Sequence, residues 1–154
     1  MPPAISGGHR ELRMRVNELA KKVGVTPDTV RYYTRIGLLT PTKNIENGYK
    51  NYASTDQKRL GFILKARHLG FAVSEIEEII NLSNKGTSPC CRAREIIHKH
   101  IDETAQKIDE LSRLRACMQK ASDTWETMPD SVPDGDSVCD LIEMWDEVEL
   151  RQSA

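Results

Sequence analysis

The chain has 154 residues, of which 38% are hydrophobic and 29% charged, a composition typical of one water-soluble globular domain with an appendage. No apolar stretch approaches the ~20 residues that a membrane-spanning helix needs, and residues 1–15 contain no apolar run of the signal-peptide type. We therefore expect a cytoplasmic protein without membrane contacts. Its four cysteines should be thiols, suited to metal or redox chemistry more than to disulfides.

The net charge of −1 hides an uneven distribution along the chain. Residues 1–70 carry 13 Lys and Arg against 5 Asp and Glu, a net charge of +8, so residues 71–154 carry −9. All four tyrosines lie in the basic part and all four cysteines in the acidic part. This division suggests that the first part binds a polyanion and that the second part has a different task.

The basic part predicts two short helices followed by a hairpin. Apolar residues follow helical spacing from Val16 to a stop at Gly24, and Thr26-Pro27-Asp28 is a strong start for a second helix that ends at Gly37. Two such helices form a helix-turn-helix, whose second helix normally enters the DNA major groove. Asn47-Gly48 is a two-residue hairpin signal, and a hairpin placed after a helix-turn-helix is a wing.

Two further helices are predicted to start with capping boxes. Ser54 with Gln57 forms the first box, and Asp56 adds an acid to the same turn. Ser74 with Glu77 forms the second box.

The longest predicted helix follows Ser88-Pro89 and meets neither Pro nor Gly before Pro129. A helix of about 36 residues is ~54 Å long and cannot be buried by its own chain, so we expect a partner helix in a homodimer. Residues 126–136 form a predicted loop, and a short helix follows. The seam of the long helix consists of Ile97, Ile101, Thr104, Ile108, Leu111, Arg115, Met118, Ser122 and Trp125.

Several motifs closely resemble those of the mercury-resistance-regulator (MerR) family of bacterial transcription activators. They are Val16-Asn17-Glu18-Leu19-Ala20, Thr29-Val30-Arg31-Tyr32-Tyr33, Ile36-Gly37-Leu38-Leu39, Asn47-Gly48-Tyr49-Lys50-Asn51-Tyr52 and Leu69-Gly70-Phe71. The resemblance is dense over residues 15–82 and looser beyond.

The resemblance implies a mainly α fold, a winged helix-turn-helix followed by a long antiparallel coiled-coil dimerisation helix and a C-terminal effector-binding loop with a short helix. The expected parts are a loose extension 1–14, a DNA-binding domain 15–83, a hinge 84–88, a dimerisation helix 89–125 and a metal-binding effector loop with its helix 126–154. It further implies a homodimer on promoter DNA with RNA polymerase as partner. Activation would come from bending and untwisting the DNA, a deformation of order 1–6 kcal/mol.

Family position also implies which residues contact DNA. These are Arg31 and Tyr32 in the second helix, Tyr49, Lys50 and Tyr52 in the wing, and Arg59 in the third helix; Lys43 is a further donor to phosphate from the wing. We expect Tyr33 and Leu39 in the core. For Lys21 and Lys22 a solvated face and a phosphate contact are equal alternatives.

The cysteines suggest a metal site. Cys90 and Cys91 follow Ser88-Pro89 into the first helical turn, and Cys139 similarly follows Ser137, where free N–H groups stabilise a thiolate. Because the spacing is not of the C-x-x-C type, these residues alone are equally compatible with small buried hydrophobes.

The family resemblance favours the metal. It implies that Cys90 and the loop's Cys139 bind a divalent ion (Zn, Cd, Hg or Pb) from different subunits, whereas Trp125 occupies the place of the loop's first cysteine. The third donor is open between Cys91, Asp134, Asp136 and low coordination, and a carboxylate would favour Zn over Hg. The residues expected outside the site are His98, His100 and Cys117, and Trp125 and Trp145 are expected to cover the loop.

Two alternatives remain at this point. One is a regulator of the same type that senses an organic ligand or an oxidant through its thiols. The other is an architectural DNA-binding protein without an effector. An enzyme is not expected, because the sequence has no Gly-rich phosphate loop, nucleophile elbow or H-E-x-x-H pattern.

Overall fold

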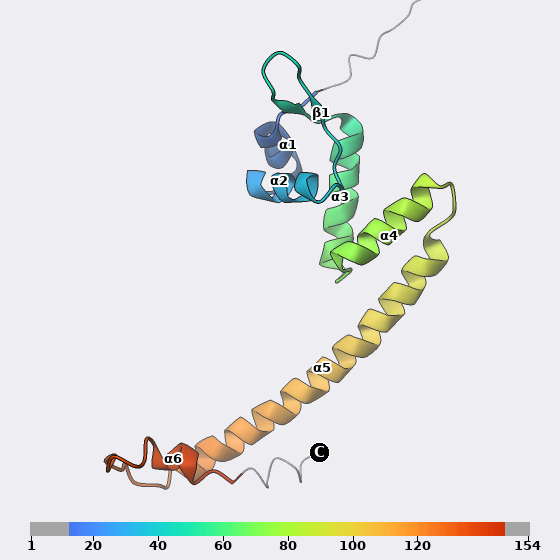
Figure 1. Ribbon diagram of the computed structural model, residues 1–154. Helices are drawn as coiled ribbons and strands as arrows, with labels where there is room; N and C mark the ends of the chain where they lie inside the picture. Colours follow the sequence, from blue (N-terminus) through green and yellow to red (C-terminus); the bar gives the residue numbers. More distant parts are fainter. Residues whose placement is uncertain (1–12, 147–154) are drawn as a thin grey trace, which may run out of the picture. The chain divides into compact units, whose positions relative to one another are not determined.

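The computed structural model describes residues 13–146. Contacts divide the described residues into two compact units, one ending at Ile97 and the other beginning at His98. The fold is mainly helical, as expected (Figure 1). In chain order the elements are α1 (Val16–Val23), α2 (Pro27–Arg35), β1 (Thr42–Lys43), β2 (Lys50–Asn51), α3 (Ser54–His68), α4 (Val73–Asn84), α5 (Cys90–Trp125) and α6 (Asp140–Glu143).

Helices α1 and α2 form the predicted helix-turn-helix. Gly24 ends α1 in the left-handed conformation, with φ 81°, which a residue without Cβ adopts at no steric cost. Thr26 caps α2, because its hydroxyl oxygen accepts the Thr29 N–H at 3.3 Å. Leu19 and Val30 then bury their side chains completely in the shared core.

The wing is a short antiparallel ribbon in which Thr42 pairs with Asn51 and Lys43 with Lys50. Its loop is wider than the two-residue turn that the sequence suggested. The Asn47 side-chain oxygen accepts the Tyr49 N–H at 3.0 Å, and Gly48 has a φ of 71°. The side chain of Asn47 therefore stabilises the turn together with the backbone freedom of Gly48.

Met14 belongs to this first unit and not to the loose extension in which the sequence analysis placed it. Its N–H donates to the Tyr52 carbonyl at 2.8 Å, and the Tyr52 N–H donates back at 2.7 Å. The Met14 side chain is also buried. Residues 1–12 of the expected extension lie outside the described residues.

The start of α3 differs by one residue from the predicted capping box. Ala53 is the N-cap, so Ser54 is the first helical residue and does not cap. The buried Asp56 carboxylate instead accepts the Ala53 N–H at 3.0 Å and the Thr40 N–H at 3.2 Å. This tertiary link to Thr40 fixes where the helix begins. Helix α4 likewise starts after Ala72 without a side-chain cap.

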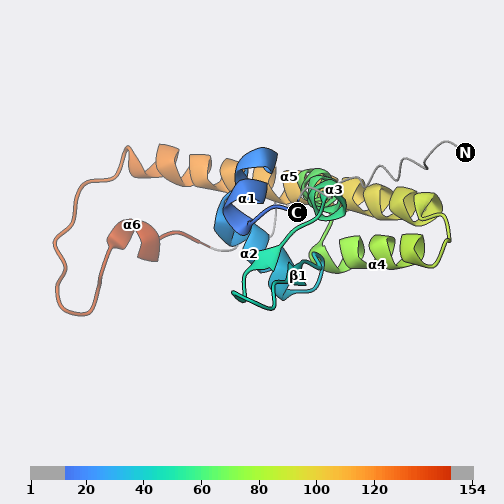
Figure 2. The same cartoon turned by 90° about the horizontal axis from the view of Figure 1, so that it is seen from above.

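The first turns of α5 belong to the unit that ends at Ile97, which is named the DNA-binding unit after the role that the sequence predicts for it. Ile96 is 1% exposed within the hydrophobic core, and Ala93 and Ile97 pack against that core. Helix α4 lies beside this part of α5 in Figure 2. We expected a division at residues 84–88, but the compact unit extends through that segment to Ile97 because these apolar residues are buried in it.

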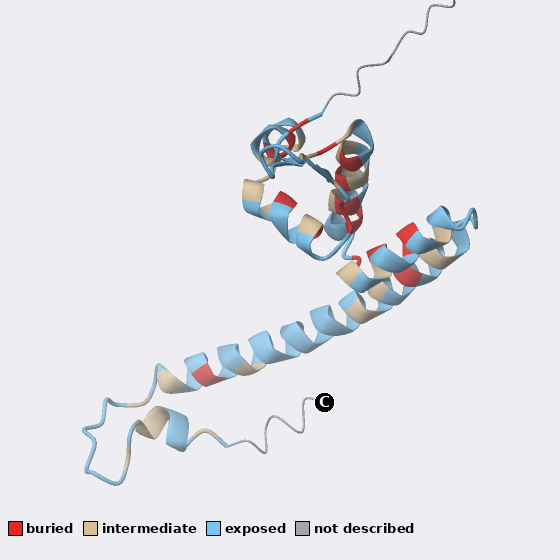
Figure 3. Ribbon diagram, turned by 45° about the horizontal axis from the view of Figure 1, so that its top comes forward, coloured by how far each residue is buried: buried red, intermediate tan, exposed pale blue. Residues whose placement is uncertain are grey.

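Helix α5 beyond Ile97 is mostly exposed (Figure 3). Four apolar residues of the predicted seam have exposed side chains, namely Ile101, Ile108, Leu111 and Met118. At the end of α5, the Trp125 ring packs edge to face against the Trp145 ring, with 6.4 Å between the ring centroids. The two residues flank the loop that they were expected to cover. Within residues 13–146 no helix is both long and apolar enough to cross a membrane.

We expect Asp56→Ala to destabilise the DNA-binding unit by about 2–3 kcal/mol, because it leaves two N–H groups without their acceptor. Urea unfolding at fixed protein concentration measures the loss. The control Ser54→Ala should change stability by less than ~0.5 kcal/mol. If both variants lose the same stability, Ser54 caps α3 after all.

Candidate functional site

A basic hollow of about 440 Å³ opens between α1, α2 and the wing. Arg15, Arg31 and Lys50 contribute three cations to its lining, and Tyr49 and Asn17 lie beside them. The Arg15 guanidinium lies 4.5 Å from the centre of the Tyr49 ring, a cation–π contact that holds both side chains at this edge. A concave surface with three cations suits a phosphate backbone.

Arg15 lines this hollow, although no sequence motif pointed to it as a candidate for DNA contact. The position of Arg15 directly before α1 could have indicated such a role, because the first N–H groups of a helix have no partner within the helix and attract anions. The backbone bridge between Met14 and Tyr52 carries Arg15 to the wing. That pairing of distant segments is not visible in a motif.

Two residues of α2 remain available to a ligand. Arg31 donates to Asp28 at 2.8 Å, but both side chains are largely exposed, so this ion pair is weak and readily exchanged for a phosphate or a base. Tyr32 is exposed beside the Arg35 guanidinium. As expected, Tyr33 and Leu39 are buried.

Tyr52 is corrected from an expected DNA contact to a core residue. Its side chain is 0% exposed, and its hydroxyl shares a 2.8 Å hydrogen bond with the Thr34 hydroxyl. A buried ring cannot reach a phosphate. It packs beneath the wing and joins the wing to α2.

The remaining basic residues differ in their surroundings. Lys43 and Lys50 stand directly opposite each other in the ribbon, an arrangement that is unfavourable without a nearby polyanion. Arg59 is half-buried and donates to the Asn84 side-chain oxygen at 3.4 Å. It lines a separate hollow between α3 and α4 with Lys58.

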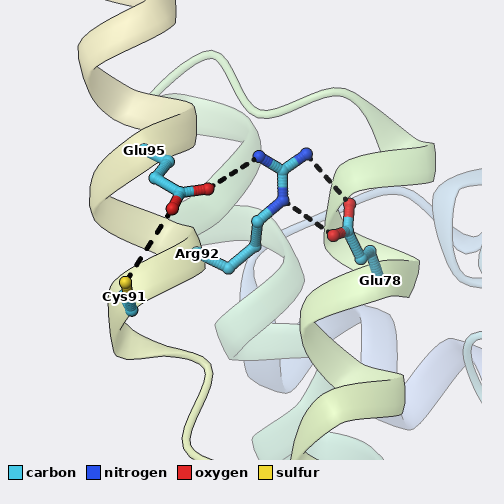
Figure 4. Close-up of polar contacts among 4 residues, drawn as sticks. All are labelled: Glu78, Cys91, Arg92 and Glu95. Atoms are coloured by element: carbon cyan, nitrogen blue, oxygen red, sulfur yellow. Dashed lines mark hydrogen bonds and ion pairs between the residues drawn. The ribbon is translucent and has the colours of Figure 1, made fainter.

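The predicted thiols at the start of α5 are both exposed. The Ser88 hydroxyl oxygen accepts the Cys90 N–H at 3.4 Å, as the predicted cap requires. The Cys91 thiol donates to Glu95 Oε1 at 3.8 Å, one helical turn further on (Figure 4).

Arg92 connects the Cys91 thiol to α4 through the carboxylates of Glu95 and Glu78 (Figure 4). Its Nε donates to Glu78 Oε1 at 2.7 Å, its Nη2 to Glu78 Oε2 at 3.3 Å, and its Nη1 to Glu95 Oε2 at 3.2 Å. The hydrogen bond from Arg92 lowers the pKa of Glu78, and its bonds to Glu78 and then Glu95 raise the pKa of Arg92. The bidentate geometry gives this ion pair more directionality than an ordinary surface pair.

The predicted donors of the C-terminal loop are arranged differently from expectation. Cys139 is half-buried and is itself the N-cap residue of α6, so Ser137 does not cap that helix. Asp134 Oδ1 accepts the N–H groups of Asp136 and Ser137 at 3.0 and 3.1 Å, and these bonds lower the pKa of Asp134. Both aspartates are exposed, but Asp134 organises the loop by accepting these hydrogen bonds.

Within residues 13–146 of the chain, no three His, Cys, Asp or Glu side chains gather in a way that could hold a metal ion. Cys117 is half-buried, and His98 is exposed. His100 pairs with Glu103 at 3.5 Å. The donors that the sequence suggested are therefore distributed over both units.

Comparisons with known proteins agree with this architecture. The profile described as "MerR HTH family regulatory protein" matches residues 14–83, and the profile "MerR, DNA binding" matches residues 57–121. The HTH-type transcriptional regulator ZntR homolog of Haemophilus influenzae is 36% identical over 102 residues, covering 66% of this chain and 76% of its own. The mercuric resistance operon regulatory protein of Bacillus cereus is 32% identical, with coverages of 67% and 78%.

Solved structures show the same fold. The transcription regulator PbrR691 from Ralstonia metallidurans CH34, crystallised in complex with lead(II), superposes with a TM-score of 0.67 at 24% identity, covering 86% of this chain and 99% of that chain. EcmrR, solved by cryo-EM with DNA in the EcmrR-RPo assembly, has a TM-score of 0.57 at 30% identity, with coverages of 71% and 40%.

We expect Arg15→Ala and Lys50→Ala each to reduce the salt dependence of DNA binding by about one phosphate contact, a slope change of roughly 0.9 in log Kd against log salt. Fluorescence anisotropy with a duplex of arbitrary sequence measures this slope. Tyr52→Phe is the control and should leave the slope unchanged, although it loses about 1 kcal/mol of stability with its hydrogen bond. If Lys50→Ala leaves the slope unchanged, the wing does not contact the DNA backbone. If Arg15→Ala leaves the slope unchanged, the start of α1 does not contact it.

Proposed function

The chain belongs to the MerR family of helix-turn-helix transcriptional regulators, a family without enzymatic activity, and we propose that it activates a bacterial promoter when it binds a divalent heavy-metal ion. The dimer would bind promoter DNA with and without the ion. Only the ion-bound form would bend and untwist the DNA for RNA polymerase.

The basic hollow carries the DNA-binding part of this proposal. Arg15, Arg31 and Lys50 come from three elements and converge on one concave surface. Convergence of positive charge favours a phosphate backbone, and the neighbouring α2 supplies side chains for base contacts. The structures of relatives with DNA support the same use.

A homodimer is supported by the apolar stripe of α5. Ile108, Leu111 and Met118 expose roughly 60% of their surface, which favours a partner helix with the same seam. An antiparallel second copy would place the start of one α5 beside the end of the other. Because a 36-residue helix is about 54 Å long, such pairing is the economical way to join donors near both of its ends.

The metal part is supported by thiols and by relatives. Cys90 from one subunit and Cys139 of the partner subunit would bind the ion, with the remaining donors drawn from Cys91, Asp134 and Asp136. The relatives include a mercuric resistance regulator and a regulator crystallised with lead(II). We propose Zn, Cd, Hg or Pb as the class of effector. The structure favours Asp136 over Asp134, since Asp134 is engaged in its own turn.

The effect of ion binding would reach the DNA-binding unit through the first two turns of α5. Ile96 lies in the core of the DNA-binding unit, and Arg92 ties the same helix to Glu78 of α4. A force applied at Cys90 would therefore act on the whole winged unit and not on a loose linker. The deformation of DNA requires such a stiff connection.

The proposal is tested with purified, reduced protein and a duplex that the protein selects from a random library. Zn, Cd, Hg or Pb should change the DNA bend, measured by fluorescence energy transfer between the duplex ends, while binding persists. The same ion should raise transcription by RNA polymerase from a template that carries the selected sequence. A response to peroxide or an organic ligand alone would favour the sensing alternative, and no response to any effector would favour an architectural protein.

Mixed dimers test the site across subunits. A dimer with Cys90→Ser in one subunit and Cys139→Ser in the other keeps one intact site, so we expect one ion per dimer against two in the wild type. Equilibrium dialysis with metal analysis measures the stoichiometry. Heterodimers that bind no ion would place both cysteines in a site within one chain.

A further inference from the structure

Cys91 and Glu95 form a pair of donors with the spacing of two metal ligands. They are one turn apart on α5, and Cys91 Sγ lies 3.8 Å from Glu95 Oε1 (Figure 4). Zinc binds sulfur at about 2.3 Å and carboxylate oxygen at about 2.0–2.2 Å, so its tetrahedral geometry places two such ligands roughly 3.5–3.7 Å apart. The pair could therefore hold an ion with little movement.

Arg92 orients this pair. It bonds to Glu95 through Oε2, at 3.2 Å, and leaves Oε1 directed at the sulfur. Arg92 is itself held by both oxygens of Glu78 on α4. Outer contacts of this kind fix the orientation of metal-binding side chains and strengthen binding.

We propose that Cys91 and Glu95 are two donors of the effector site, Glu95 supplying the oxygen that compensates for the loop cysteine replaced by Trp125. This inference rests on the proposed function. On binding, the Cys91 S–H bond breaks, its proton leaves to solvent, and the sulfur and Glu95 Oε1 both bond to the ion. Cys90 and the partner's Cys139 would complete the four donors of a closed zinc site. Because no three such side chains gather within residues 13–146 of this chain, Cys90 would have to move towards the pair when the ion binds.

The donor set determines which ion is preferred. A carboxylate oxygen contributes to binding of zinc, which accepts oxygen, nitrogen and sulfur ligands, but adds little for mercury, which is satisfied by thiolates. Glu95 therefore shifts the site towards zinc. An ion bonded to Glu95 is also connected through Arg92 to Glu78, and hence to α4 of the DNA-binding unit.

The experiment compares the full-length reduced wild type with Glu95→Gln and the matched control Glu103→Gln. Glu103 is a carboxylate on the same helix whose contacts are Lys99 and His100, without a cysteine. Competition with a chromophoric chelator gives the zinc affinity, and competition with a thiol ligand gives the mercury affinity. The Glu95 side chain is 60% exposed, so the substitution does not disturb the core.

We expect Glu95→Gln to weaken zinc binding at least tenfold while mercury binding stays within about threefold of wild type. Glu103→Gln should change neither. Cys91→Ser should weaken both ions, since it removes a sulfur. Metal-free DNA affinity should be the same in all variants.

The outcomes separate the two proposals. If the wild type binds an effector ion and Glu95→Gln binds zinc equally well, Glu95 is not a ligand, and the proposed function stands. Equal losses of zinc and mercury affinity in Glu95→Gln would also overturn the oxygen-donor role, because they indicate a general disturbance. If the wild type binds no divalent heavy metal, the proposed function and this inference fail together.

Discussion

The burial of Ile96 in the core of the DNA-binding unit is the constraint on which the other features depend. Its side chain is 1% exposed, and Ala93 and Ile97 pack beside it. The first two turns of α5 therefore cannot move independently of the helix-turn-helix without opening an apolar core, at a cost of about 1.5–3 kcal/mol for each large side chain. The exposed thiols of Cys90 and Cys91 thus lie at the start of a helix that is packed into the unit proposed to contact DNA, where an ion bound to them could act on that unit.

The electrostatics of the same unit follow from its surplus of positive charge. Lys43 and Lys50 face each other across the ribbon, and like charges in that position weaken a two-stranded sheet. The wing remains in place because Met14 pairs with the Tyr52 backbone and the Tyr52 hydroxyl bonds to Thr34. The buried Tyr52 thus supports a positively charged surface that would suit a polyanion. Tyr52 supports the wing from below, whereas Tyr49, three residues earlier, lies on its surface. This difference in role explains why Tyr52 is buried and Tyr49 is exposed.

Local signals in the sequence predicted the elements, whereas tertiary pairing decided the roles of several residues. Thr26 and Gly24 act through their own backbone neighbourhood, so the helix-turn-helix could be identified from them. Asp56 could not be recognised in the same way, because one of its two partners, Thr40, is sixteen residues away. Tyr52 was misassigned since a motif gives no side-chain direction. The i, i+4 spacing of Cys91 and Glu95 is visible in the sequence. The ion pair of Arg92 with Glu78, which orients Glu95, forms only in the folded unit.

An incomplete set of donors in one chain would link the proposed effector binding to dimerisation. Within residues 13–146 no three suitable side chains gather in one chain, and the proposed site accordingly takes donors from two subunits. Such an ion stabilises the dimer relative to the monomer, by about 2.7 kcal/mol at a concentration one hundred times its Kd. The same free energy is of the order needed to bend DNA. A site shared between subunits, as proposed, would therefore let one binding event strengthen the α5 pairing and contribute energy for the deformation of the promoter.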